Sequence, residues 1–205
     1  EEELAPPPKQ GVLGMLGNTS LGLPLPGLGG DAREGVLILL GNSGVGKTRL
    51  VRVLEAGGTL HAQPEENNWA ACKPTRLPTL GKVRLSSPKE HCDMVTWDVP
   101  GDIALRPLVT FSLRGLAPRL KMMPHVLLLY DPLDRNSFRA LKRWHAMAVD
   151  ALGPPVNFVL VATRHVATHG DVSPTEARTW GRQHGIRLLV QIVLHASDDE
   201  ALPHA

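Results

Sequence analysis

The stretch GVLILLGNSGVGKT, residues 35–48, places a run of apolar side chains directly before a glycine-rich loop that ends in Lys-Thr. The loop fits the pattern G-x-x-x-x-G-K-[S/T], in which glycines let successive backbone N–H groups turn inward around a phosphate. The apolar run predicts a buried strand at 36–40, and the apolar spacing after the loop predicts a helix at 48–55. We therefore expect a strand, a phosphate-binding loop and a helix in direct succession.

The loop supplies the expected phosphate ligands, which are Gly41, Asn42, Ser43, Gly44, Val45, Gly46, Lys47 and Thr48. The Lys47 ammonium can reach the β- and γ-phosphates of a nucleotide, and the Thr48 hydroxyl can ligate Mg²⁺. The alternative is a glycine-rich turn with an incidental lysine. The strand before the loop and the helix after it favour nucleotide binding.

Beyond the loop, short apolar runs alternate with longer amphipathic ones. The further strands are expected at 82–85, 94–99, 126–130, 156–162 and 187–194, and the further helices at 103–117, 137–152 and 175–184. Strands of continuous Val, Ile and Leu that alternate with helices are typical of a parallel sheet covered on both faces. The fold class is therefore α/β, doubly wound, with a mostly parallel six-stranded sheet.

The first part of the chain differs in composition from the rest. Residues 1–34 are rich in Pro and Gly and predict a flexible arm, while the leucines within them also suit docking on the domain or on a partner. The 205-residue chain is long enough for this arm and one buried domain. We expect an N-terminal arm at 1–34 and one folded domain at 35–205.

Charge and cysteine content exclude several classes of protein. The net charge of +2 is too small to indicate a nucleic-acid or anionic-membrane partner, and no apolar run reaches the ~18 residues of a membrane span. The two cysteines lack the CxxC spacing of a zinc or redox site, which fits a reducing compartment. We expect a cytoplasmic protein.

Two further motifs stand at expected strand ends. TWDVPGD (96–102) resembles the W-D-x-x-G element of Ras-superfamily small GTPases, and YDPLDRNSFRALKRW (130–144) matches the Rab-type run of Y-D, S-F and W. With the phosphate loop, these motifs cover 36–166 in the correct order, so the chain resembles a Rab-like small GTPase. The resemblance implies a P-loop NTPase fold that binds GTP or GDP with Mg²⁺, with Asp98 at the metal and Gly101 at the γ-phosphate.

The family's first switch carries a threonine that meets the γ-phosphate and Mg²⁺. The stretch RLPTLGKVRL resembles the family's T-I-G segment and nominates Thr79 for this role, with Thr75 in KPTR as the alternative. The segment between Thr48 and Thr79 is longer than is usual for the family. A loop of this length is commonly mobile or ordered by a partner.

Two positions depart from the family pattern. Asp102 stands where the family has the Gln that orients the attacking water, and an ionised carboxylate cannot donate that hydrogen bond. We therefore expect weak hydrolysis, with a general-base role for Asp102 as the opposing interpretation. Val166 stands where the guanine-reading Asp of N-K-x-D belongs, which leaves Thr163 and Arg164 beside the base and predicts reduced base selectivity.

The chain resembles the atypical Rab-like subunit of intraflagellar transport particles in both departures and in having no terminal cysteine for a prenyl anchor. That resemblance implies a slowly hydrolysing GTP-binding subunit of a larger complex, docking protein partners through its switch regions in the cytoplasm, a cilium or a flagellum. The other hypotheses are a pseudo-GTPase structural subunit and a P-loop kinase or ATPase. The W-D-x-x-G and YD-SF-W elements speak against the last.

Overall fold

The computed structural model describes residues 35–55, 75–86, 91–164 and 170–193. The strands are β1 (Gly35–Leu40), β2 (Thr79–Ser86), β3 (His91–Asp98), β4 (His125–Tyr130), β5 (Asn157–Arg164) and β6 (Leu189–Val193). The helices are α2 (Lys47–Glu55), α3 (Arg106–Leu116), α4 (Arg135–Leu152) and α5 (Pro174–Gln183), with short 3-10 turns η2 (Ile103–Leu105) and η3 (Ala117–Arg119) on either side of α3.

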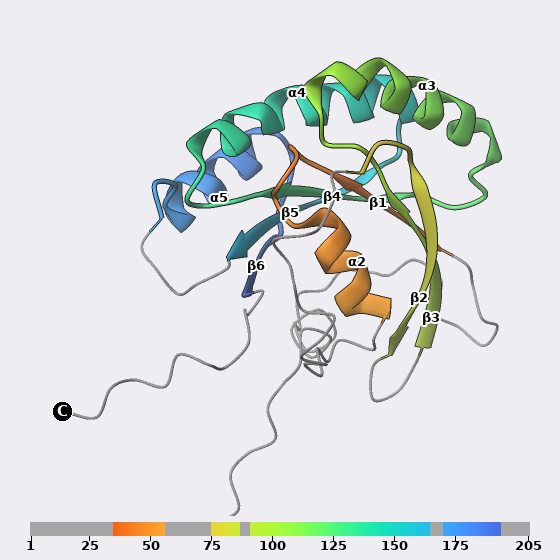
Figure 1. The fold of residues 1–205 in the computed structure, drawn as a ribbon, viewed down its shortest axis with the longest axis horizontal. Helices are drawn as coiled ribbons and strands as arrows, with labels where there is room; N and C mark the ends of the chain where they lie inside the picture. The colour runs from red at the N-terminus through yellow and green to blue at the C-terminus, as the bar shows by residue number, and fades with distance from the viewer. Residues whose placement is uncertain (1–34, 56–74, 87–90, 165–169, 194–205) are drawn as a thin grey trace, which may run out of the picture.

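The strands form one six-stranded sheet in the order β2-β3-β1-β4-β5-β6 (Figure 1). β2 and β3 pair antiparallel, and every other neighbouring pair is parallel. Because β1 lies between β3 and β4, the chain reverses its direction of winding at β1, and a crevice at the ends of these strands is the usual ligand site of such sheets. The predicted doubly wound α/β fold is confirmed.

The predicted elements differ from the observed ones mainly at their ends. The strand expected at 82–85 begins earlier, at Thr79, because it pairs along its whole length with β3. The helix expected at 103–117 is divided into η2, α3 and η3. Pro118 lies in η3, directly after α3, and a proline there cannot donate the backbone hydrogen bond that would continue the helix.

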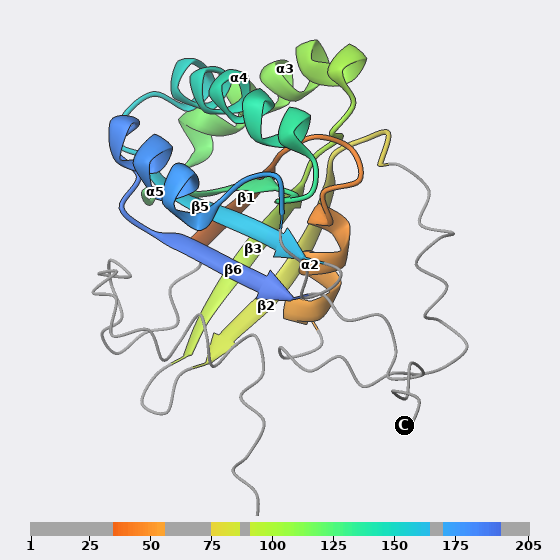
Figure 2. The ribbon, with the colours of Figure 1, turned by 90° about the vertical axis from the view of Figure 1, so that its left-hand side faces the viewer.

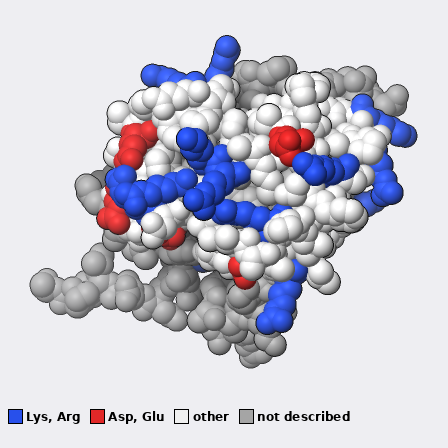
Figure 3. All heavy atoms as spheres, turned by 90° about the horizontal axis from the view of Figure 1, so that it is seen from above, with Lys and Arg blue, Asp and Glu red and all other residues white. Residues whose placement is uncertain are grey.

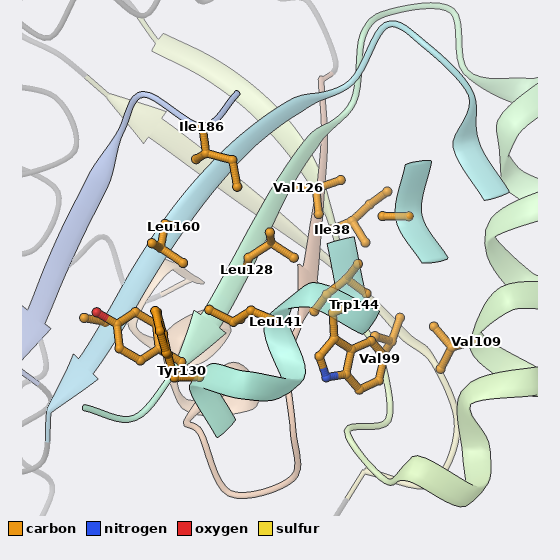
Figure 4. Close-up of a cluster of buried hydrophobic side chains, with 14 of the residues drawn as sticks. Ile38, Val99, Val109, Val126, Leu128, Tyr130, Leu141, Trp144, Leu160 and Ile186 are labelled. Atoms are coloured by element: carbon orange, nitrogen blue, oxygen red, sulfur yellow. The ribbon is translucent and has the colours of Figure 1, made fainter. Parts of the chain in front are cut away.

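Alternation along the strands builds two apolar layers, one on each face of the sheet. Ile38 and Leu40 face the layer of α3, α4 and α5, whereas Leu37 and Leu39 face the layer that contains α2. The first layer is drawn in Figure 4, where the indole of Trp144 lies among aliphatic side chains of β1 and β4 and their neighbours. The sheet is therefore a central layer with apolar packing on both sides.

The Y-D and S-F residues serve the turn between β4 and α4. The Ser137 hydroxyl accepts a hydrogen bond from the Asp131 N–H at 3.0 Å and donates one to the Asp134 carbonyl at 2.7 Å. The Asp134 carboxylate caps α4 by accepting from the Asn136 N–H at 2.9 Å. Phe138 and Trp144 are buried and pack α4 against the core on this side of the sheet.

Candidate nucleotide-binding site

The phosphate loop joins β1 to α2 with a backbone that only glycine adopts easily. Gly44 and Gly46 both have φ near +85°, in the region that an L side chain disfavours. Helix α2 then begins at Lys47, so its unpaired N-terminal N–H groups lie at the end of the loop. This is the predicted arrangement of a curled loop feeding a helix N-terminus, which suits an anion.

Lys47 is buried and held beneath the loop. Its ammonium Nζ donates to the carbonyl oxygens of Gly41 at 3.0 Å and Asn42 at 2.9 Å. Burial lowers the pKa of Lys47 to about 8, and the nearby Asp98 carboxylate opposes this shift only in part. An ammonium destabilised in this way gains from an anion placed next to it.

Three oxygen-bearing side chains meet beside the start of α2. The Thr48 hydroxyl donates to Asp98 Oδ2 at 2.5 Å, and Thr75 Oγ1 lies 3.0 Å from Thr48 Oγ1. The other carboxylate oxygen, Asp98 Oδ1, is buried and has no hydrogen-bond partner among the described residues. Burial raises the pKa of Asp98, although the hydrogen bond from Thr48 and the charge of Lys47 act in the opposite direction. A carboxylate and hydroxyls are the ligands of a hard divalent cation such as Mg²⁺.

The structure places Thr75, not Thr79, beside the expected metal ligands. Thr79 is exposed at the first position of β2, and its Cα is paired with that of Asp98 on β3. This pairing places Thr79 beside the end of β3. The residues before Thr79 bring the chain next to Thr48. The geometry brings the alternative residue, Thr75, beside Thr48, and which of the two threonines meets a metal stays a prediction.

Gly101 packs directly against the phosphate loop. Its carbonyl accepts a hydrogen bond from the Ser43 N–H at 3.0 Å. A Cβ at this position would overlap the backbone of Asn42 and Ser43 and the Lys47 ammonium. The W-D-x-x-G glycine is thus required here for close approach to the loop, and its predicted contact with the γ-phosphate stays a prediction.

Asp102 has a local structural role. Its carboxylate Oδ1 accepts from the Ala104 N–H at 2.9 Å and caps the turn η2, and the residue is exposed. The carboxylate that stands in place of the expected Gln is therefore already hydrogen-bonded to the neighbouring backbone. Its effect on hydrolysis stays a prediction.

Thr163 supports the loop from behind. Its buried hydroxyl lies 2.7 Å from the Val45 carbonyl oxygen and 3.2 Å from that of Tyr130. Thr163 is thus connected to the backbone of the phosphate loop. Arg164 ends β5, and its side chain lies outside the described part, as does Val166.

One contact to the loop has no counterpart among the sequence predictions. The indole Nε1 of Trp144 donates to Asn42 Oδ1 at 3.0 Å, and the Arg106 guanidinium lies 4.8 Å from the centre of the same indole ring. Burial and the charge of Arg143 lower the pKa of Arg106. A side-chain bond between residues 102 positions apart leaves no local pattern in the sequence.

Charge is unevenly distributed over the helices. Seen from the side of α3, α4 and α5, the molecule presents many Lys and Arg side chains and few acidic ones (Figure 3). The exposed basic residues of α4 and α5 are Arg139, Lys142, Arg143, Arg178 and Arg182. Two other arginines form ion pairs, Arg114 with Asp150 and Arg135 with Glu176. The net charge of +2 of the whole chain therefore does not describe this face, on which basic side chains predominate.

The fold and the site together define a class of protein. A loop of this pattern between β1 and α2, with Asp98 at the end of β3 beside Thr48, is the arrangement of a P-loop domain with the small-GTPase fold. No helix within the described ranges has both the length and the hydropathy to cross a bilayer.

Sequence comparison relates the chain to particular members of that class. It is 30% identical over 146 residues to the Ras-related protein Rab-42 of Mus musculus, a match covering 69% of this chain and 60% of that protein. It is 24% identical over 154 residues to a probable Ras-related protein Rab-4A of Echinococcus multilocularis, covering 74% of this chain and 62% of that protein. No family model matches. The chain is therefore similar to Rab proteins and spans about three fifths of the length of these two.

Proposed function

We propose that the chain is a Rab-like protein that binds GTP or GDP with Mg²⁺ and hydrolyses GTP weakly or not at all. The observation that carries the proposal is the cluster at the loop, where Lys47 lies beside Asp98, and Asp98 and Thr75 both lie beside Thr48. One side of the cluster offers a buried cation to phosphate, and the other offers oxygen ligands to a metal. Similarity to Rab proteins supports GTP as the nucleotide.

The residues present fit a magnesium nucleotide. The buried Asp98 Oδ1 has no hydrogen-bond partner among the described residues, so a cation there would supply the missing interaction. Thr48 and Thr75 would complete the protein's share of the ligands, and Lys47 would neutralise the phosphates. A bound Mg²⁺ offsets negative charge on the β- and γ-phosphates. The protein's own part is to hold that charge in place.

Weak hydrolysis follows from what stands after Gly101. Orienting a water for attack needs a side chain that both donates and accepts hydrogen bonds, which Gln does and an ionised carboxylate does not. Asp102 already accepts from the Ala104 N–H. A carboxylate close to the γ-phosphate would also repel it.

Exposed apolar side chains support docking of a protein partner through the switch regions. Leu77 and Leu80 lie before and within β2, Ile103 lies in η2 and Phe111 in α3, with exposed fractions from 59% to 77%. Large apolar groups at such exposure are favoured where a partner covers them. We propose that a protein partner covers these side chains, in a multi-subunit complex of intracellular or ciliary transport.

A pseudo-GTPase structural subunit without turnover is the second candidate. The close packing of Gly101 favours this candidate. The Gly101 carbonyl accepts a hydrogen bond from the Ser43 N–H, and a Cβ at Gly101 would overlap the Lys47 ammonium. These contacts close the loop on itself.

Chromatography of the nucleotide released from the denatured protein tests both candidates. Retained GTP without turnover supports the first and an empty site the second, whereas ATP with phosphate production would reject both in favour of a kinase or ATPase. Lys47→Ala should abolish occupancy. Thr75→Ala should weaken Mg²⁺-dependent binding at least about tenfold, as loss of a metal-supporting group does, with Thr79→Ala as the matched control. Equal loss in the two threonine variants would reject the assignment of Thr75.

A further inference from the structure

Helices α4 and α5 lie side by side on one face of the sheet and carry an excess of basic residues (Figures 1 and 2). Helix α4 contains four Lys or Arg residues and one acidic residue, and α5 contains two Arg residues and one acidic residue. With histidines neutral, the two helices hold a net charge of +4, whereas the whole chain holds +2. Both acidic residues are already in ion pairs, Asp150 with Arg114 and Glu176 with Arg135. The other basic residues of the two helices are all exposed and are Arg139, Lys142, Arg143, Arg178 and Arg182.

The spacing of these charges does not favour the helices that carry them. Arg139 and Arg143 lie four positions apart in α4, and Arg178 and Arg182 lie four positions apart in α5. Residues at this spacing are neighbours on a helix surface, where like charges are destabilising and opposite charges are stabilising. An exposed helix face that serves only solubility commonly mixes the two signs. The stability of the fold therefore does not explain why these positions are basic.

Three of these residues form one surface, here called the α4 ridge. Arg139, Lys142 and Arg143 are exposed at positions i, i+3 and i+4 of α4, which places them on the same side of the helix. The opposite side of α4 is buried against the sheet, with Leu141 and Ala148 among its residues. Basic side chains gather near the middle of the helix-covered face in Figure 3. The α4 ridge is thus a basic surface that is turned away from the core.

A further cation, Arg106 at the start of α3, lies close to the α4 ridge. Its guanidinium is 4.8 Å from the centre of the indole ring of Trp144, the residue that follows Arg143. Burial and the charge of Arg143 lower the pKa of Arg106, so the two guanidinium groups repel each other. The Nε and Nη2 atoms of Arg106 are buried and have no hydrogen-bond partner among the described residues. An anion bound at Arg143 would offset this repulsion.

The residues around the α4 ridge favour a protein ligand over a membrane or a nucleic acid. Binding in a bilayer surface needs large apolar side chains among the basic ones, and within α4 and α5 the exposed one is Val149, near the end of α4. Single-stranded nucleic acid is bound by stacking on exposed aromatic rings. The rings of these two helices are turned inward, because Phe138 and Trp144 are buried and Trp180 stacks on His184. An acidic protein segment supplies carboxylates without either requirement.

We propose that the α4 ridge binds a segment of a partner protein that is rich in Asp and Glu. Arg139 and Arg143 each bind a carboxylate through two parallel N–H groups of the guanidinium, and Lys142 adds a single point charge. Arg178 and Arg182 on the neighbouring helix add long-range attraction. This surface differs in chemistry from the exposed apolar side chains of β2, η2 and α3. The α4 ridge is therefore a second docking site, and its binding does not depend on which nucleotide is bound.

Fluorescence anisotropy of a labelled oligo-glutamate peptide, titrated with the 205-residue chain at physiological ionic strength, tests the proposal. The α4 variant carries Arg139→Gln and Arg143→Gln. The matched control carries Arg119→Gln and Lys121→Gln, which removes the same charge from exposed residues in η3 and just after it. The α4 variant should bind the peptide at least about fivefold more weakly, and the control should bind within about twofold of the unmodified chain. Circular dichroism checks that both variants fold, because substitutions at exposed positions change stability little.

Three results would overturn the proposal. If the unmodified chain does not bind the peptide, the α4 ridge does not take an acidic segment. If the α4 variant and the control lose the same affinity, the peptide responds to net charge and not to the ridge. Vesicles that contain an anionic lipid, a single-stranded oligonucleotide and a DNA duplex are titrated in the same way. Tighter binding of any of these than of the peptide, lost in the α4 variant alone, would assign the ridge to a membrane or to a nucleic acid.

Discussion

Replacing Thr163 by valine removes a single buried hydroxyl while keeping the shape of the side chain. The hydroxyl lies 2.7 Å from the Val45 carbonyl oxygen and the residue is fully buried. The valine variant leaves that carbonyl without its side-chain donor, which costs about 1–3 kcal/mol for a buried group. In a domain of this size, that loss lowers the melting temperature by about 2–12 °C.

Urea unfolding followed by circular dichroism measures the loss, and amide exchange of the phosphate loop locates it. Thr163→Ser is the control, because it keeps the hydroxyl and loses only a methyl group, at about 1 kcal/mol. Faster exchange at 41–46 should occur in the valine variant and not in the serine variant. If loop exchange in the two variants is the same, Thr163 does not secure the loop through its hydroxyl.

Three further outcomes are expected. Nucleotide affinity should be constant below the Lys47 pKa of about 8 and fall by up to tenfold per pH unit above it, because the neutral amine cannot attract phosphate; a flat titration from pH 7 to 9.5 would contradict this. Burial lowers the pKa of His125, which lies 2.8 Å from the Asn157 amide, so the folded state resists protonation. The free energy of unfolding should therefore decline as pH falls below about 6.5, the unfolded-state pKa. His125→Gln should lessen that slope in urea titrations, and an unchanged slope would assign it elsewhere. Trp144→Phe removes the donor to Asn42 and should cost about 1–3 kcal/mol, with Trp180→Phe as the control; equal costs would mean that the bond adds nothing.

The fold was predictable because its signals are local. The strand before the glycine loop and the other strands of continuous Val, Ile and Leu were predicted from neighbouring residues, and the structure places them as expected. The position of Lys47 directly after a loop that curls at Gly44 and Gly46 was predictable for the same reason. Local patterns thus determine both the framework and the phosphate loop.

The remaining features of the site depend on contacts between distant segments. The choice between Thr75 and Thr79 rests on the register of β2 against β3, which a local match to T-I-G does not specify. Asp102 reads as a substitution at a catalytic position, but its carboxylate is used to cap η2. The bond from Trp144 to Asn42 follows from how α4 packs, which no spacing in the sequence encodes.

The indole of Trp144 gives the protein a built-in optical reporter. Its N–H is bonded to the phosphate loop at Asn42, and the Arg106 guanidinium at the start of α3 lies over its ring. A displacement of either element changes the electric field across the indole, and with it the wavelength and intensity of emission. Occupancy of the loop should therefore shift the emission of this one side chain in the unlabelled protein, once the other tryptophans are replaced.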